Sequence, residues 1–448
     1  MGDAALHDLR DVSRDVARVV DRWVRWRAAL AHAPESAADE DPFSSARYVS
    51  GKATYDALAA RATSTSELPL RDGLRRWVYA LMQARITRDL DVERARATVA
   101  ANGRFEGKAP RLVSFRESIR GLVEARSEEE ASLWLRAAEA AAPKLASIGR
   151  ERARRIVEVS HRAGRDESLD VAIDVQHAAM RSAARALLAQ TDDIASSSRR
   201  GSPCTTILDA VARDAPDGWP ARLTGNWLEE LFGGLATGLT VRLPKLPHVL
   251  GASSFARALY AFGHSLRVAA NERGVPFAVA HEAQFIAAHQ HGYVIAALTA
   301  DAEFQRVALH TARHVAMAQA RVLARTALLE VRLQAARWLL ADARDYASKG
   351  AFEELSARIF GQPLAEALAG AWPSPRDDES ARLVGLLTSA PFARELVERF
   401  DVDWYRNPRA AVELRLRAAM TTGAAPASAE ELLAGAAALA RAFEDALG

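Results

Sequence analysis

The chain has 448 residues, of which 49% are hydrophobic and 26% are charged, and its formal net charge at neutral pH is +2. A chain of this length can bury more than one hydrophobic core, so we expect two or three subdomains. Acidic residues are interleaved with basic ones, which argues against nucleic-acid binding, and no run of about 18 uncharged apolar residues is present to span a membrane.

The first 190 residues repeat apolar residues at helical spacing. The predicted helices in this part cover residues 12–30, 74–86, 128–142, 150–161 and 169–188. In the first of them, Trp23 and Trp26 are three residues apart, so we expect both rings to face the interior while the neighbouring arginines reach solvent. We predict an N-terminal helical lobe over residues 1–190.

A polar stretch follows this lobe. Residues 191–204, TDDIASSSRRGSPC, are rich in serine, contain glycine and proline, and have no apolar period. Such a composition is typical of a linker. We therefore place a boundary there and predict a C-terminal lobe over residues 205–448.

The C-terminal lobe is also predicted to be helical. Residues 239–243, which alternate apolar and polar side chains before Pro244, form its only convincing strand pattern. Helical spacing returns at residues 252–268 and in a long alanine-rich segment over residues 301–347. The sequence thus predicts a mainly α, two-lobed protein with a minimal β element near 239–243.

Cysteine and lysine are both scarce. The single cysteine, Cys204, excludes an internal disulfide and fits a reducing compartment, and the charged N-terminal residues contain no apolar signal region. We therefore expect a cytoplasmic protein. Only five of the 59 basic residues are lysines, and alanine is abundant, which is typical of a GC-rich bacterial genome.

Histidines cluster in the second half of the chain, where seven of the eleven lie between His248 and His314. His310 and His314 are four residues apart, so on a helix both rings can face the same way. Two histidines make half of a metal site, and no carboxylate can be assigned to complete it. The histidines that could in principle bind a metal are His264, His281, His289, His291, His310 and His314.

The segment Tyr260-Ala261-Phe262-Gly263-His264 lies on a predicted helix. It resembles His-Glu-Phe-Gly-His, the motif of zinc peptidases of the thimet oligopeptidase and oligoendopeptidase F family. In that motif two histidines on one helix face bind zinc, and the glutamate between them activates a water. Here His264 matches the second histidine, whereas Tyr260 and Ala261 stand where the family has the first histidine and the general base.

The resemblance extends over roughly residues 219–447. Val275-Pro276-Phe277 precedes a predicted helix that reaches Ala297, and within this helix His291-Gly292-Tyr293 resembles the Glu-Gly-aromatic sequence of the family. The resemblance implies a third zinc ligand on this helix, for which Glu282 and His291 are both candidates. The tail, over residues 392–400 and 403–409, resembles the C-terminal helices and the aromatic-Asn-Pro stretch of bacterial peptidases.

The departures from the family pattern affect the residues that bind zinc and carry out catalysis. Loss of the glutamate removes a general base that is commonly worth about 10²-fold or more in rate. A tyrosine can replace the lost zinc ligand only as a phenolate, which is costly near neutral pH. The family's downstream tyrosines, which bind the tetrahedral intermediate, are also missing from the corresponding residues 377–384.

The resemblance implies a two-lobed helical metallopeptidase-like fold with a central cleft and no catalytic residues. The protein would be a pseudopeptidase that binds a peptide or partner protein, or a regulatory subunit of an active paralogous peptidase, and no cofactor is expected. The residues of the degenerate site would be Tyr260, Ala261, His264, Glu282 and His291.

Two alternatives belong to other classes. The first is an enzyme with a repurposed metal site, holding zinc or iron; its ligands would come from His264, His291, His310 and His314. The second is a helical scaffold without any function in a cleft.

Overall fold

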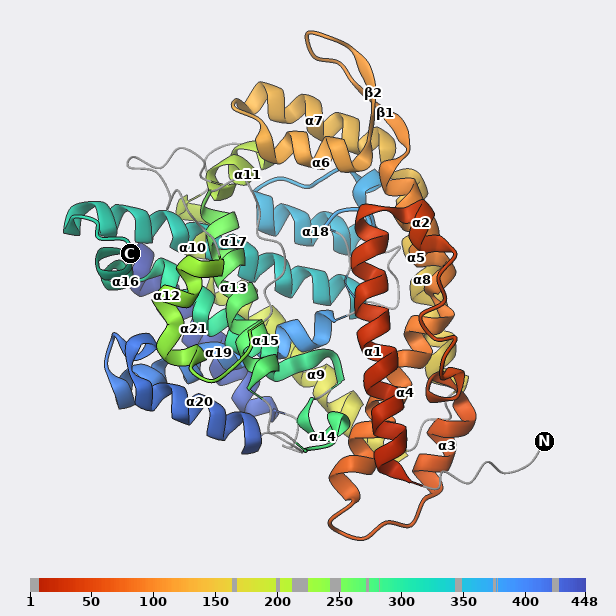
Figure 1. Cartoon of the computed structure of the whole chain (residues 1–448). Coiled ribbons are helices and arrows are strands. Elements are labelled where there is room, and N and C mark those ends of the chain that lie inside the picture. Colours follow the sequence, from red (N-terminus) through yellow and green to blue (C-terminus); the bar gives the residue numbers. More distant parts are fainter. Residues whose placement is uncertain are drawn as a thin grey trace.

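The computed structural model of the chain is mainly α-helical, with one short two-stranded sheet (Figure 1). The prediction of a mainly α protein with a minimal β element is therefore confirmed. The structure describes residues 8–162, 167–198, 202–211, 225–241, 251–270, 274–281, 283–342, 349–373, 376, 378–420 and 427–448.

The N-terminal helices form one side of the molecule. They are α1 (Leu9–His32), α2 (Pro34–Ala38), α3 (Lys52–Ala60), α4 (Leu68–Ile86) and α5 (Arg88–Val99), with the 3-10 turn η1 (Arg47–Ser50). Trp23 and Trp26 of α1 are buried as predicted, while Arg25 is exposed. The indole N–H of Trp26 donates to the carbonyl of Ala37 at 2.9 Å, so its one polar atom is satisfied inside the core.

A β-hairpin follows α5, at a place where no strand was predicted. Strand β1 (Ala101–Phe105) pairs antiparallel with β2 (Arg111–Ser114), and the hairpin extends from the top of the molecule in Figure 1. It is held on α7 (Glu128–Ala141), where the Phe105 ring stacks on Trp134 with centroids 3.9 Å apart. Gly103 allows this approach, because a Cβ there would lie 2.4 Å from the carbonyl oxygen of Ala137.

The prediction of a strand near residues 239–243 is wrong for residues 239–241, the part of it that the structure describes. Residues 239–241 have no regular structure, and residues 242 and 243 lie outside the described residues. The N–H of Leu239 bonds to the carbonyl of Ala236, which closes a turn after α12, and both Leu239 and Val241 pack against a hydrophobic cluster. The alternation of apolar residues therefore reflects burial on one side without a partner strand.

The middle of the chain continues with helices, several of which begin at side-chain caps. They are α6 (Phe115–Glu124), α7 (Glu128–Ala141), α8 (Pro143–Arg162), α9 (Glu167–Gln190), α10 (Asp192–Ser198) and α11 (Pro203–Val211). Ser114 and Glu117 form a reciprocal capping box that fixes the start of α6 directly after the hairpin.

The linker predicted over residues 191–204 is thus largely helical. Helix α10 occupies half of it, and Asp192 at its start is paired with Arg332 and Arg358 from distant helices. Serine-rich composition indicates a linker, but Asp192 anchors this stretch to the core by accepting charge-assisted hydrogen bonds from both arginines.

The remaining helices fill the centre and the far side of the molecule. They are α12 (Gly225–Ala236), α13 (Ala252–Ala269), α14 (Phe277–Ala280), α15 (Ile286–Ala297), α16 (Ala302–Ala308), α17 (Arg313–Asp342), α18 (Lys349–Phe360), α19 (Glu379–Phe400), α20 (Pro408–Met420) and α21 (Ala429–Leu447), with the 3-10 turns η2 (Ala283–Phe285), η3 (Leu298–Ala300), η4 (Glu366–Leu368) and η5 (Trp404–Arg406). The helix predicted at 252–268 is present as α13.

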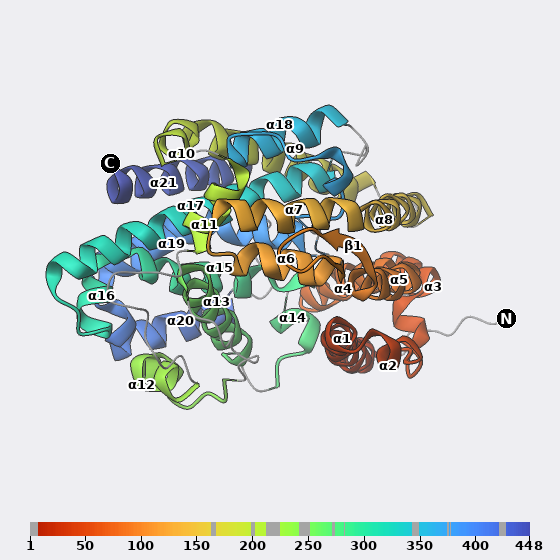
Figure 2. The same cartoon turned by 90° about the horizontal axis from the view of Figure 1, so that it is seen from above.

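Three hydrophobic clusters make up the described core. One fills the space among α1–α5 and α14, a second joins α12, α13, α15, α17, α19 and α20, and the third runs from α5 to α21. The third includes Leu187 of α9, Trp338 of α17 and Leu432 of α21, so apolar packing is continuous across the boundary predicted at residues 191–204. Figures 1 and 2 both place α1–α4 on one side and α16, α20 and α21 on the opposite side.

No helix in the described part of the chain is both long and apolar enough to cross a membrane.

Candidate functional site

Helices α13, α15 and α19 approach one another closely in the centre of the molecule, and glycines make the approach possible. A Cβ built on Gly292 of α15 would lie 2.8 Å from the ring of Tyr260 on α13. A Cβ on Gly385 of α19 would lie 2.8 Å from the Cβ of His289 on α15. The two glycines therefore position Tyr260 and His289 between the helices.

Tyr260, His289, Asp378 and Arg382 form a connected polar cluster at this crossing. The Tyr260 hydroxyl lies 2.5 Å from His289 Nδ1, and Arg382 Nη1 donates to the Tyr260 oxygen at 3.0 Å. His289 Nε2 lies 3.3 Å from Asp378 Oδ2, and Arg382 Nε donates to Asp378 Oδ1 at 2.9 Å. The four side chains thus close a ring of contacts.

The partners of His289 define its tautomer. Asp378 is an acceptor, so Nε2 carries the proton, and Nδ1 then accepts from the Tyr260 hydroxyl. The Tyr260 oxygen still has a lone pair that accepts from Arg382. Each donor in the cluster therefore faces an acceptor. The cluster is a neutral tyrosine and a neutral histidine bound to an arginine–aspartate ion pair.

The pKa values support these protonation states. Burial, followed by the nearby Tyr293, raises the pKa of Tyr260 well above its usual value. Burial also lowers the pKa of His289, although the hydrogen bond to Asp378 opposes this shift. Burial alone would raise the pKa of Asp378, but the His289 hydrogen bond and the Arg382 charge hold it well below its usual range.

His264, on the next turn of α13 after Tyr260, lies beside this cluster. Its ring centroid is 5.0 Å from that of His289 and 6.2 Å from that of Phe285. Burial first, and then His289 and Arg382, lower the pKa of His264 to about 3, so the ring is neutral across the physiological range.

The other residues predicted for the degenerate site are placed differently. Ala261 lies on α13 beside Tyr260 and contributes no polar side chain. His291 is buried on α15, where its Nδ1 lies 2.8 Å from the carbonyl of Ala287 and its ring packs near Phe392. Glu282 lies outside the described residues.

His310 and His314, whose spacing allows them to share a helix face, do not do so. The long helix expected over residues 301–347 is broken after α16, and His310 lies between α16 and α17 with a φ of 52°. The Thr311 hydroxyl donates to the carbonyl of Gln305, which satisfies an acceptor at the end of α16. His310 and His314 are both exposed and lie in different local structures.

The donor set around Tyr260 does not fit a zinc site. A protonated phenol that is bonded to His289 and Arg382 is a poor ligand, and Ala261 offers no base. In the part of the chain that the structure describes, no group of three or more histidine, cysteine, aspartate or glutamate side chains is arranged to hold a metal ion.

Sequence reasoning missed the partners of Tyr260. It considered His289 only as one of six histidines, and it examined residues 377–384 only for tyrosines. The spacing of Asp378 and Arg382, four residues apart, does predict an ion pair on one face of a helix. Nothing in the sequence indicates that this pair reaches Tyr260, which is more than a hundred residues away.

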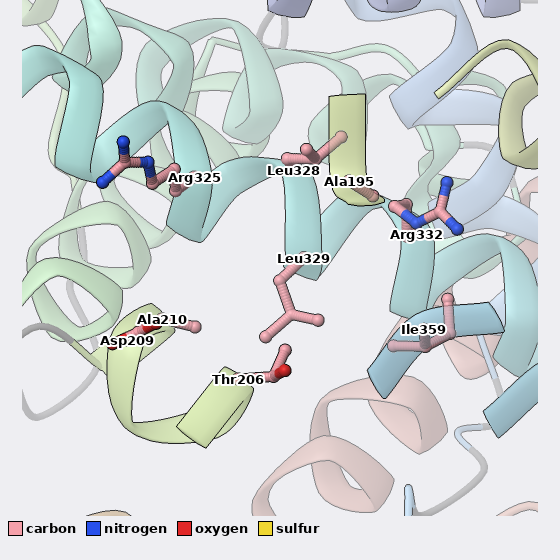
Figure 3. Close-up of a pocket in the computed structure, with 9 residues that line it drawn as sticks. All are labelled: Ala195, Thr206, Asp209, Ala210, Arg325, Leu328, Leu329, Arg332 and Ile359. Atoms are coloured by element: carbon pink, nitrogen blue, oxygen red, sulfur yellow. The ribbon is translucent and has the colours of Figure 1, made fainter. Parts of the chain in front are cut away.

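A separate pocket lies among α10, α11, α17 and α18 and encloses about 430 Å³ of space, part of it open solvent. Its lining includes Thr206, Leu329 and two arginines, Arg325 and Arg332. Figure 3 shows Leu329 and Thr206 directed toward each other, while both arginine side chains extend away from them. Arg332 is engaged by Thr191 and Asp192, so its guanidinium serves the packing of these helices.

A scan of the chain against models of protein families gives no match, and no curated protein matches it. The resemblance to zinc peptidases therefore rests on the quoted residues and stays a prediction.

Proposed function

We propose that the protein is a non-catalytic relative of thimet-type peptidases that binds a peptide or a segment of a partner protein without cleaving it. The observation that supports this proposal is the bonding of Tyr260. The residue at the position of the first zinc ligand has its hydroxyl bound to His289 and Arg382, at 2.5 and 3.0 Å.

This bonding opposes zinc chemistry in two ways. The pKa of Tyr260 is raised well above its usual value, mainly by burial, so the phenolate that a metal requires does not form near neutral pH. The neighbouring Ala261 has no group to activate a water. A tyrosine–histidine–aspartate–arginine cluster thus occupies the place that the resemblance assigns to the metal.

The direct test is a peptidase assay with purified protein, a library of quenched fluorescent peptides, and a chelator in parallel. We expect no chelator-sensitive cleavage and less than about 0.1 equivalent of zinc by elemental analysis. Robust cleavage that disappears in the chelator and in the His264→Ala variant would defeat the proposal. Peptide binding is measured separately, by fluorescence anisotropy of labelled peptides. If no peptide binds, the part of the proposal that concerns peptide binding is wrong.

A matched variant tests the relationship to the peptidases. The double substitution Tyr260→His and Ala261→Glu restores the residue types of the motif on α13. We expect it to bind zinc at least about tenfold more tightly than the original chain, because two histidines then share one helix face. Equal zinc affinity in both proteins would contradict the resemblance.

A further inference from the structure

The first half of α17 carries arginines without acidic neighbours on the same helix. Residues 313–329 contain Arg313, Arg321 and Arg325 but no aspartate or glutamate. Arg321 and Arg325 are four residues apart, so they project from the same face of the helix, and both are exposed. Neither side chain forms a hydrogen bond or salt bridge with a residue that the structure describes. This face of α17 is therefore positively charged.

The N-terminal helix α1 is arranged differently. There, Arg14, Arg18 and Arg25 each form a salt bridge with an aspartate three or four residues earlier in the chain. Such pairs balance the charge on the surface of a helix. No pairing of this kind reduces the positive charge of Arg321 and Arg325, so both guanidinium groups are available to a partner.

The same face of α17 leads into the pocket among α10, α11, α17 and α18. Arg325 and Leu329, one helical turn apart, both belong to the lining of this pocket. The apolar part of the lining consists of short aliphatic side chains, those of Ala195, Ala210, Leu328, Leu329 and Ile359. In Figure 3, the Arg325 side chain extends away from Leu329 and Thr206. A charged group and an apolar recess thus lie next to each other.

Hydrogen bonds hold the helices around this pocket in place. Thr326 Oγ1 donates to the carbonyl of Ala210 at 2.8 Å and ties the end of α11 to α17. Arg332 Nη2 donates to the carbonyl of Arg358 at 2.7 Å and ties α18 to α17. The pocket is therefore formed before a ligand arrives, and binding does not have to order these helices.

We propose that the surface formed by Arg321, Arg325 and this pocket binds an acidic segment of a partner protein. Carboxylates of the segment pair with the two guanidinium groups, whose geometry matches them, and an aliphatic side chain of the segment enters the pocket. Met317, which is 47% exposed and lies one turn before Arg321, adds a flexible apolar contact. Successive contacts along α17 are about 6 Å apart, which sets the spacing of the matching groups in the segment.

A nucleic acid is the other polyanion that exposed arginines can bind. Proteins hold single strands largely by stacking bases on aromatic side chains. None of the described residues that line the pocket is aromatic. The aliphatic lining therefore favours a leucine or isoleucine side chain over a base.

This surface goes beyond the proposed function, because it shares no residue with the Tyr260 cluster. The test is a selection of random peptides, displayed on phage, against the full chain. We expect enrichment of peptides that combine several acidic residues with leucine or isoleucine. Fluorescence anisotropy of the synthesised peptides then gives the Kd, which should rise with added salt because exposed charges are screened.

Variants of the protein locate the binding. Arg321→Glu and Arg325→Glu should each weaken it by at least about tenfold, because each replaces an attraction with a repulsion. Ala210→Leu should also weaken it, because the added side chain fills the pocket while both arginines stay. The matched control is Arg76→Glu, which reverses the charge of an exposed arginine on α4 and should bind as the original chain does.

The peptides provide a second test that does not depend on folding of a variant. Replacing the leucine or isoleucine of a selected peptide by serine should weaken its binding to the original chain several-fold, and replacing its acidic residues by lysine should abolish binding. If Ala210→Leu fails to fold, as judged by circular dichroism, the serine peptide decides whether the pocket is used.

Four results would overturn the surface: no enriched peptide, enriched peptides without acidic residues, binding that is unchanged in both arginine variants, or a single-stranded DNA oligonucleotide that binds more tightly than every selected peptide. A peptide whose binding changes only in His264→Ala belongs to the site of the proposed function and counts against this surface. The two proposals can therefore fail separately.

Discussion

Two arginines on α17, five residues apart, have different surroundings. Arg332 is 1% exposed; its guanidinium donates to the Leu188 carbonyl at 3.0 Å, to Thr191 Oγ1 at 2.6 Å and to Asp192 Oδ1 at 2.7 Å. Arg337 makes no hydrogen bond or salt bridge in the described part of the chain, and its Nε is buried. The Nε of Arg332 is buried in the same way, so the two arginines differ at their terminal nitrogens, which donate to several acceptors at Arg332 and to none of the described residues at Arg337.

The difference lies in the acceptors that surround each guanidinium. Around Arg332, the ends of α9 and α10 supply two neutral acceptors and a carboxylate, and Arg358 adds a second charge to the same aspartate. Around Arg337, the neighbours are Arg376, Tyr293 and Glu379, which accepts from Gln334 at 2.5 Å. Arg332 is thus bound directly by the fold, whereas Glu379 and Glu330 attract the charge of Arg337 without forming a salt bridge with it.

The largest effect should come from Arg332→Gln. It leaves Asp192 and three carbonyl or hydroxyl acceptors, on Leu188, Thr191 and Arg358, with a shorter, neutral partner, so we expect a loss of about 3–5 kcal/mol in the free energy of unfolding. Urea denaturation followed by circular dichroism measures this. The control is Arg325→Gln, an exposed arginine of the same helix, which should leave the midpoint unchanged. A small effect at Arg332 would mean that its contacts contribute little, and the comparison would fail.

The sequence predicted the helices better than their contacts. Apolar spacing found α1, α4, α7, α8, α9 and α13, because each buries one face, and Tyr260 and His264 were correctly placed together on α13. It could not find the partners of Tyr260, since Asp378 and Arg382 come from a helix more than a hundred residues later. The close approach at Gly292 and Gly385 depends on helix packing, which local pattern does not encode.

The second effect concerns the pH dependence of stability and comes from the surroundings of the Tyr260 cluster. His264 lies beside the Tyr260 cluster, and its pKa of about 3 in the folded chain is below the ordinary 6.5. The unfolded chain therefore binds more protons below pH 6.5, so stability is complete above that pH and falls as the pH drops toward 3. In this pH range, one such histidine changes the free energy of unfolding by about 1.4 kcal/mol per pH unit.

His264→Gln tests this slope. Between pH 6.5 and 5, the variant should lose about 2 kcal/mol less stability than the original chain, as measured by urea denaturation at each pH. The exposed His32→Gln should keep the original profile. Parallel profiles for the original chain and His264→Gln would show that His264 is accessible to protons in the folded protein.

A smaller effect is expected from Tyr260→Phe. The change removes a hydroxyl that donates to His289 and accepts from Arg382, and it leaves two buried groups without that partner, so we expect a loss of about 1–2 kcal/mol. The comparison is Tyr48→Phe, whose hydroxyl bonds to Asp15 at 2.6 Å on an exposed surface. Equal losses in the two variants would indicate that the Tyr260 cluster does not stabilise the fold.

The smallest effect should come from Arg337→Gln in a buffer without phosphate or carboxylates. No internal hydrogen bond is lost, and a desolvated charge that repels Arg376 is removed, so the free energy of unfolding should stay within about 0.5 kcal/mol of the original or rise. A loss as large as that of Arg332→Gln would mean that both arginines stabilise the fold, and the contrast between these two positions of α17 would disappear.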